Sequence, residues 1–215
     1  MKKYSLSGTL HTDVLEEIYG DTTVHVMQDD DTIREVLLLD ELQIARTYAI
    51  TFKNDTWRNN KEIREINETI KKGKAIGKAF TAAGYNIQKN VLDVFLVMIP
   101  SWLQFAFDTR LQSAKARMTE FVVKKNDVIT NYAIITELYA PDFRKPEISV
   151  QDKAQINIPI GVLAEPGLSN EEIWGTLQKR TAWPHFATGY DKNVKELKEK
   201  VKDIMMQSLL IESLC

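Results

Sequence analysis

A hairpin in the second half of the chain constrains the fold more than any other feature of the sequence. Two runs rich in β-branched and aromatic residues, Met118 to Lys125 and Val128 to Tyr139, are separated only by Asn126-Asp127. Asn and Asp tolerate the positive φ angles that a two-residue hairpin turn requires. The sequence therefore predicts two long antiparallel strands here, and Pro141 ends the second of them.

Further apolar segments predict the other strands of the sheet. They are Thr22 to Gln28, Ile33 to Leu39, Leu42 to Phe52, Val94 to Met98 and Ile156 to Leu163. The last of these contains Pro159 and is predicted to be an edge strand, because proline has no N–H to donate to a ladder.

Helical periodicity predicts four helices around these strands. They are Thr9 to Tyr19 with Gly20 as its C-cap, Asp55 to Gly73 with Asp55 as its N-cap, Ser169 to Leu177, and Asp191 to Leu214. The pattern of the segment from Lys74 to Val91 predicts a short helix with mobile connections. We interpret this segment either as a surface loop or as a flap over a ligand. Together, the predicted strands and helices indicate an α+β fold, with a mostly antiparallel sheet at 1–165 and a C-terminal helical extension at 166–215.

Mostly apolar residues recur along the last predicted helix at alternating steps of three and four, which places them on one face. They are Val194, Leu197, Val201, Ile204, Ser208 and Ile211. Such a face packs either against a second copy of the chain, as in a coiled coil, or against the parent domain. The sequence leaves open both a homo-oligomer through the C-terminal helix and packing within one chain.

The charge balance argues against two kinds of partner. The chain has 28 Lys and Arg and 30 Asp and Glu, a formal net charge of -2, so no basic excess is available for a nucleic acid or an anionic membrane. No stretch approaches the roughly 18 apolar residues of a transmembrane helix, and no signal peptide is visible. The only cysteine, Cys215, excludes an internal disulfide and indicates a cytoplasmic location.

The sequence lacks the motifs of most cofactor chemistry. It contains no glycine-rich phosphate loop, no Gly-x-Ser-x-Gly and no His-Glu-x-x-His. His11, His25 and His185 lack ligand spacing and are interpreted as solvated or hydrogen-bonded side chains. We therefore expect neither a metal nor an organic cofactor.

Two arginines, Arg34 and Arg46, lie inside predicted strands, where an unpaired charge costs several kcal/mol. If Asp40-Glu41 forms a two-residue turn, Glu35 lies opposite Arg46 and the two form a cross-strand ion pair. The same register places Arg34 opposite Thr47, without a carboxylate. Arg34 is then a candidate for holding an anionic ligand.

Glu137 is a further charged residue inside a predicted strand, on a face that also carries Ile129, Ala133 and Ile135. Burial among apolar side chains predicts a raised pKa, which suits a proton donor or acceptor near neutrality. The alternative interpretation is a glutamate near the strand end that reaches water.

Several short segments between Ser5 and Phe143 occur in a characteristic order. They are Ser7-Gly8-Thr9-Leu10-His11-Thr12, Arg34-Glu35-Val36-Leu37-Leu38-Leu39, Ala45-Arg46-Thr47, Ala75-Ile76-Gly77, Pro100-Ser101-Trp102-Leu103, and Thr136-Glu137-Leu138-Tyr139-Ala140-Pro141. Together they resemble the chorismate pyruvate-lyase family, especially its archaeal, cyanobacterial and mycobacterial branch.

The resemblance implies a six-stranded antiparallel sheet whose flaps enclose the product, and a cofactor-free lyase that splits chorismate into 4-hydroxybenzoate and pyruvate. It implies that Arg34 grips the ligand carboxylate and that Glu137, at the far end of the ring, is the catalytic acid or base. It also implies that the backbone N–H of Ile76, followed by Gly77, contacts the ligand, and that Arg46 is a second arginine near the site.

The chain departs from that family at several places. Ala45 stands where many members have a small residue or glycine, Thr51-Phe52 replaces the usual Ile-Pro, and the tail after Glu165 has no family counterpart. A lyase that acts on a similar enolpyruvyl or aromatic acid therefore stays open, and so do two other functions. One is a non-catalytic module of the same fold that binds an aromatic acid, and the other is an interaction protein whose strand charges are structural.

Overall fold

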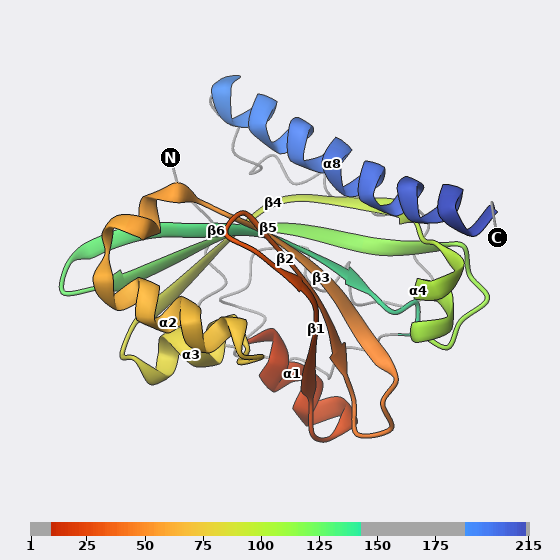
Figure 1. The fold of residues 1–215 in the computed structure, drawn as a ribbon, viewed down its shortest axis with the longest axis horizontal. Coiled ribbons are helices and arrows are strands. Elements are labelled where there is room, and N and C mark those ends of the chain that lie inside the picture. The colour runs from red at the N-terminus through yellow and green to blue at the C-terminus, as the bar shows by residue number, and fades with distance from the viewer. Residues whose placement is uncertain (1–9, 143–187, 214–215) are drawn as a thin grey trace, which may run out of the picture.

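The computed structural model (Figure 1) describes residues 10–142 and 188–213 and places six strands in one antiparallel sheet of order β1-β2-β3-β6-β5-β4. The strands are β1 (Thr23–Asp29), β2 (Ile33–Leu39), β3 (Ala45–Lys53), β4 (Asn86–Met98), β5 (Ser113–Lys125) and β6 (Val128–Tyr139). The helices are α1 (His11–Tyr19), the 3-10 helix η1 (Asp55–Asn59), α2 (Lys61–Lys71), α3 (Ile76–Ala82), α4 (Ser101–Ala106) and α8 (Thr188–Ser213). This arrangement confirms the predicted α+β class.

The hairpin of β5 and β6 has the predicted turn. Lys125 pairs with Val128, and Asn126 and Asp127 both adopt positive φ, 49° and 64°. Both φ values fit the two-residue turn whose twist matches that of antiparallel strands. The structure therefore confirms the feature from which the sheet was predicted.

The register between β2 and β3 differs from the prediction. The turn runs from Asp40 to Ile44, and Asp40 Oδ1 accepts hydrogen bonds from the backbone N–H groups of Leu42 and Ile44 at 2.9 Å each. Gln43 adopts φ 63° within it. A side chain that caps its own turn favours this longer loop over a two-residue turn.

The longer turn changes the cross-strand partners. Arg34 lies opposite Thr51, and Glu35 lies opposite Ile50. The predicted ion pair of Glu35 with Arg46 is therefore wrong, and Glu35 instead accepts a hydrogen bond from the hydroxyl of Tyr48.

The helix predicted over Asp55 to Gly73 is divided into η1 and α2. Asn60, between them, caps α2, since its side chain accepts a hydrogen bond from the backbone N–H of Ile63 at 3.2 Å. Asp55 therefore begins η1 and does not cap α2. The segment Lys74 to Val91 contains the predicted short helix, α3, and the first part of β4. It is therefore not a plain loop, and its interpretation as a flap over a ligand stays a prediction.

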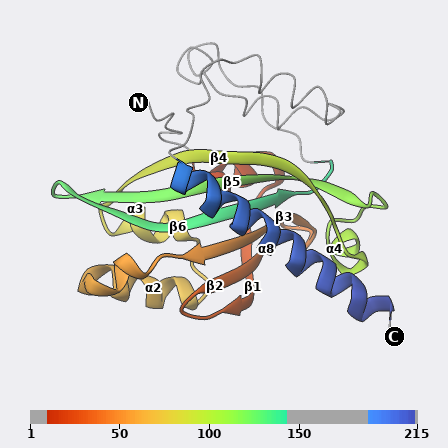
Figure 2. The same ribbon diagram turned by 90° about the horizontal axis from the view of Figure 1, so that it is seen from above.

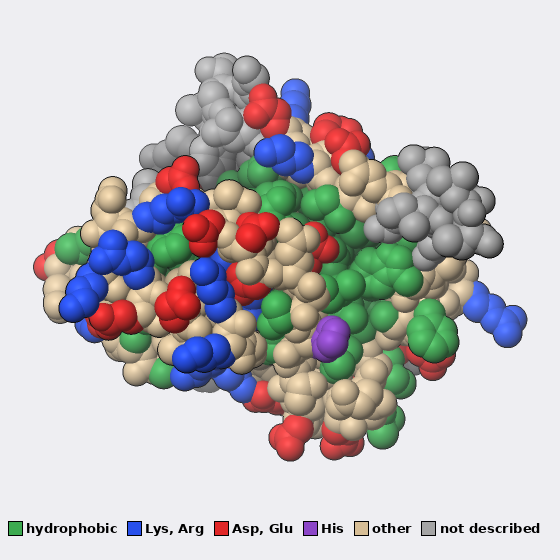
Figure 3. Space-filling model, in the orientation of Figure 1, with side chains coloured by type: hydrophobic (Ala, Val, Ile, Leu, Met, Phe, Trp, Pro, Cys, Tyr) green, Lys and Arg blue, Asp and Glu red, His purple; other side chains and the backbone are tan. Residues whose placement is uncertain are grey.

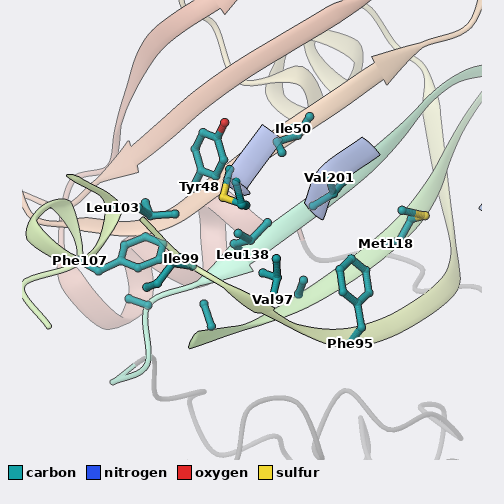
Figure 4. Close-up of a cluster of buried hydrophobic side chains, with 14 of the residues drawn as sticks. Tyr48, Ile50, Phe95, Val97, Ile99, Leu103, Phe107, Met118, Leu138 and Val201 are labelled. Atoms are coloured by element: carbon teal, nitrogen blue, oxygen red, sulfur yellow. The ribbon is translucent and has the colours of Figure 1, made fainter. Parts of the chain in front are cut away.

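The helix α8 covers one face of the sheet, while α1, α2 and α3 lie on the other side (Figures 1 and 2). Val201 and Met205 of α8 are 0% and 1% exposed and enter a core cluster with sheet residues such as Tyr48, Phe95 and Leu138 (Figure 4). Leu197 and Ile204 also pack against that cluster. Leu197, Val201 and Ile204 of the repeating face thus pack within the chain, and a homo-oligomer through this helix stays a prediction.

The face of the sheet opposite α8 carries two smaller clusters. In one, Ile63, Ile66 and Ile70 of α2 pack with Phe80 of α3. In the other, Leu15 of α1 packs with residues that alternate along β2 and β3: Val36, Leu38 and Ala49. Alternation with period two places every second residue of these strands toward the three helices.

The surface over α2 and α3 mixes charges of both signs (Figure 3). Lys61 lies 3.9 Å from Glu65, and Lys71 lies 3.5 Å from Glu68. This region therefore presents no concentrated positive field to an anionic polymer. Within residues 10–142 and 188–213, no helix combines the length and apolar character that crossing a membrane requires.

Two predicted elements lie outside the described residues. They are the edge strand Ile156 to Leu163 and the helix Ser169 to Leu177. The predicted boundary at residue 165 lies in the same segment, and the division into 1–165 and 166–215 stays a prediction.

Candidate functional site

A cavity lies between the sheet and the helices α1 and α3, with about 650 Å³ of space not filled by atoms, including its opening to solvent. Its apolar wall includes Val24, Val36, Leu38, Ala49, Phe121 and Ile135. Its polar side chains are His11, Thr12, Arg34, Thr51, Lys89, Thr119 and Glu137. A mostly apolar wall with a few convergent polar groups is typical of a ligand site.

Strand register brings these polar side chains together. Arg34 lies opposite Thr51, Thr51 opposite Ile135, and Ile135 opposite Thr119. Glu137 lies two residues from Ile135 and therefore points to the same face of the sheet. The cavity floor is thus built by four adjacent strands, β2, β3, β6 and β5.

The side chain of Arg34 is 2% exposed and is held in place by the neighbouring strand β1 and by the helix α2. Its Nε lies 2.9 Å from Asp29 Oδ2, and its Nη2 donates to the carbonyl oxygen of Ile70 at 3.1 Å. Asp29 belongs to β1, on the side of β2 away from β3. The prediction that Arg34 lacks a carboxylate neighbour is therefore wrong, because only the β3 side was considered.

The cavity end at Arg34 nevertheless keeps a positive charge. Asp29 is shared by two cations, since Lys53 Nζ lies 2.5 Å from its Oδ1. The side chains of Arg34, Lys53 and Asp29 are at most 5% exposed. Two positive charges and one negative charge leave this buried group able to attract an anion.

Glu137 is held by two donors. Arg117 Nη2 lies 2.5 Å from Glu137 Oε2, and the Tyr139 hydroxyl donates to the same oxygen at 2.7 Å. Burial alone would raise the pKa of Glu137, but the positive charge of Arg117 outweighs it and holds the pKa below its usual range. The predicted raised pKa is therefore wrong. Glu137 is an ionised carboxylate at neutral pH.

His11 stands beside this ion pair. Its Nε2 lies 2.8 Å from Thr47 Oγ1, and its ring packs edge-to-face against Tyr139 with the centroids 5.4 Å apart. Burial lowers the pKa of His11 to about 4, so the imidazole is neutral at neutral pH. The interpretation of His11 as a hydrogen-bonded histidine is confirmed.

Lys89 of β4 is a cavity residue that sequence reasoning missed. It is 9% exposed and makes no hydrogen bond or ion pair with any described residue. Asn86, Gln88 and Asn90 around it are polar, which hid the start of the strand. The available signal was alternation, because Lys89 lies between Ile87 and Val91 at strand spacing.

Ile76 and Gly77 begin α3 and both line the cavity. A Cβ atom on Gly77 would lie 2.6 Å from Leu10 Cδ2, just before α1. Glycine therefore permits the close approach of α1 and α3 over the cavity.

Arg46 is not a cavity residue. Its Nε lies 2.7 Å from Asp40 Oδ2, its Nη1 lies 2.8 Å from Asp142 Oδ2, and its guanidinium stacks over the ring of Tyr19 at 4.4 Å. The structure thus unites Arg34, Ile76, Gly77 and Glu137 and places Arg46 elsewhere.

The described residues contain no group of three or more His, Cys, Asp or Glu side chains placed to hold a metal ion. The polar side chains that line the cavity supply the cations of Arg34 and Lys89, the ionised carboxylate of Glu137 and the neutral imidazole of His11. A scan against models of known protein families finds no match, and a search of the curated proteins finds none either.

Proposed function

We propose that this cavity binds a carboxylic acid built on a single six-membered ring, and that the protein is a chorismate pyruvate-lyase acting without a cofactor. One observation carries the proposal. Arg34, Ile76, Gly77 and Glu137 come from distant parts of the chain and line one cavity. These are the residues to which the family resemblance assigns the ligand contacts.

Arg34 is the residue that holds the ring carboxylate. It is almost fully buried, yet the shared Asp29 neutralises only part of the charge around it. A planar guanidinium binds both oxygens of a carboxylate at once. The apolar residues Val36, Leu38 and Ile135 provide surface for the ring.

The reaction needs a base more than an acid. A proton leaves the ring carbon that bears the hydroxyl group, the C–O bond to the enolpyruvyl group breaks, and its electron pair leaves with the ether oxygen. The ring becomes 4-hydroxybenzoate, and the enolpyruvate takes up a proton to become pyruvate. Glu137 is ionised and so acts as the proton acceptor, driven by the aromatisation of the product.

A second function is a binding module without turnover. The observation that favours it is the double contact of Glu137 with Arg117 and Tyr139. A carboxylate whose pKa is lowered is a weak base, and a buried ion pair of this kind also occurs as a purely structural feature.

The test follows chorismate and its products. The purified protein is incubated with chorismate without added metal, and 4-hydroxybenzoate and pyruvate are quantified by chromatography against a control without protein. Equimolar products that are lost in Glu137→Gln support the lyase.

A matched control is Glu120→Gln. Glu120 is also buried, accepts hydrogen bonds from Asn90 and Asn131 at 2.6 and 2.7 Å, and does not line the cavity. This variant should retain turnover. Surviving chorismate together with a melting temperature raised by 4-hydroxybenzoate would favour the binding module, and neither turnover nor binding would refute the proposal.

A further inference from the structure

The cavity contains a second cation on the opposite side from Arg34. Lys89 lies on β4, at the far end of the strand order, and Arg34 lies on β2, so that β3, β6 and β5 run between their strands. Lys89 pairs with Phe121 in the β4–β5 ladder, and both side chains line the cavity. The two cations therefore approach a bound ligand from different sides.

Lys89 lines the cavity without a partner among the described residues. It is 9% exposed and makes no hydrogen bond or ion pair within the described part of the chain. The carboxylate that affects it most is Glu137, which is already bonded to Arg117 and Tyr139. A cation without a counter-charge inside a protein destabilises the folded state, and ionisable groups perturbed in this way cluster at functional sites.

A neighbouring hydroxyl group is also without a partner. Thr119 is 3% exposed, lines the cavity, and its Oγ1 is buried without a hydrogen bond among the described residues. A buried hydroxyl without a partner is uncommon in folded proteins. The hydroxyl of Thr119 and the ammonium group of Lys89 are both donors available to an acceptor in the cavity.

We propose that Lys89 binds a second carboxylate of the ligand, so that the cavity selects ring acids that carry two carboxylates. This inference rests on the proposed binding of a ring acid at Arg34. In chorismate the second carboxylate is that of the enolpyruvyl group, attached through an ether oxygen at the ring position next to the hydroxyl group. Lys89 thus holds the part of the substrate that leaves as pyruvate.

Electrostatics agree with this geometry. Burial lowers the pKa of Lys89; Glu137 opposes this, Arg117 adds to it, and Asp13 of α1 opposes it. A bound carboxylate would reverse the lowering and draw a proton onto the amine.

The test compares two ring acids that differ by one carboxylate. Vanillate carries a methoxy group at the ring position where 3-(carboxymethoxy)-4-hydroxybenzoate carries a carboxymethoxy group, which supplies the second carboxylate. Neither acid can eliminate pyruvate. Calorimetry on the wild-type protein should show that the dicarboxylate binds about tenfold or more tightly than vanillate. Lys89→Met should reduce that ratio to about one while vanillate affinity stays within about threefold.

The control is Lys198→Met, because Lys198 is on α8 and pairs with Asp93 at 2.7 Å, away from the cavity. It should keep the wild-type ratio. Lys89→Met should also raise the melting temperature without ligand, since it removes a cation that makes no ion pair with a described carboxylate. A Lys89→Met protein that keeps the wild-type ratio, or that fails to fold, would overturn the inference. If wild-type protein binds neither acid, the proposed function itself fails.

Discussion

Replacing Glu137 by glutamine should destabilise the protein, whatever it does to turnover. Glu137 Oε2 accepts hydrogen bonds from both Arg117 and Tyr139, and Arg117 is only 8% exposed. Glutamine would leave the guanidinium of Arg117 buried without its counter-charge. Removal of one partner of a buried ion pair costs about 3 to 5 kcal/mol. Because the glutamine carbonyl still accepts one hydrogen bond, we expect about 3 kcal/mol.

Urea unfolding measures this loss directly. Glu137→Gln should lower the unfolding free energy by about 3 kcal/mol. The double variant Glu137→Gln with Arg117→Met should be more stable than Glu137→Gln alone, since it removes the unpaired guanidinium. A Glu137→Gln protein within about 0.5 kcal/mol of the wild type would refute the account of this ion pair.

Three other predictions concern separate parts of the molecule. The unfolded chain binds a proton at His11 near pH 6.5, but the folded protein binds it only near pH 4, so the unfolding free energy should fall by up to about 3 kcal/mol as the pH drops between these values. In His11→Gln, the unfolding free energy should depend less on pH in that window. Met205→Ala should cost about 2 to 5 kcal/mol in urea unfolding, whereas Met206→Ala, at a 49% exposed position, should stay within about 0.5 kcal/mol; equal effects would contradict the packing of α8 on the sheet. Gly77→Val should weaken 4-hydroxybenzoate binding about tenfold or more in calorimetry, because its Cβ displaces Leu10 from the cavity wall, and unaltered affinity would count against that close approach.

Local turn chemistry decides which parts of the fold could be predicted. Asn126 and Asp127 sit between two long apolar runs, and their φ angles are those the dipeptide favours. Asp40-Glu41 also lies between two apolar runs, yet the Asp40 side chain caps a longer loop and shifts the register. The sequence shows the Asp40 carboxylate but not which N–H groups it will accept from.

The sequence predicted which residues form the candidate site better than it predicted their charges and pKa values. Arg34 and Glu137 stand out as charges in apolar strands, and the cavity holds both. The pKa of Glu137 was predicted in the wrong direction because Arg117 lies opposite it on β5, a pairing that depends on long-range register. Lys89 escaped notice because a strand that begins with polar residues gives a weak pattern.

The affinity of 4-hydroxybenzoate for Arg34 variants tests the central claim most directly. Arg34→Met leaves Asp29 paired with Lys53, so the fold should survive the change. Calorimetry should show that Arg34→Met binds 4-hydroxybenzoate about 30-fold to 1000-fold more weakly than the wild type, a difference of about 2 to 4 kcal/mol. Arg46 lies outside the cavity, so Arg46→Met should bind 4-hydroxybenzoate as the wild type does. Equal affinity of the wild type and Arg34→Met would contradict the assignment of this cavity as the ligand site.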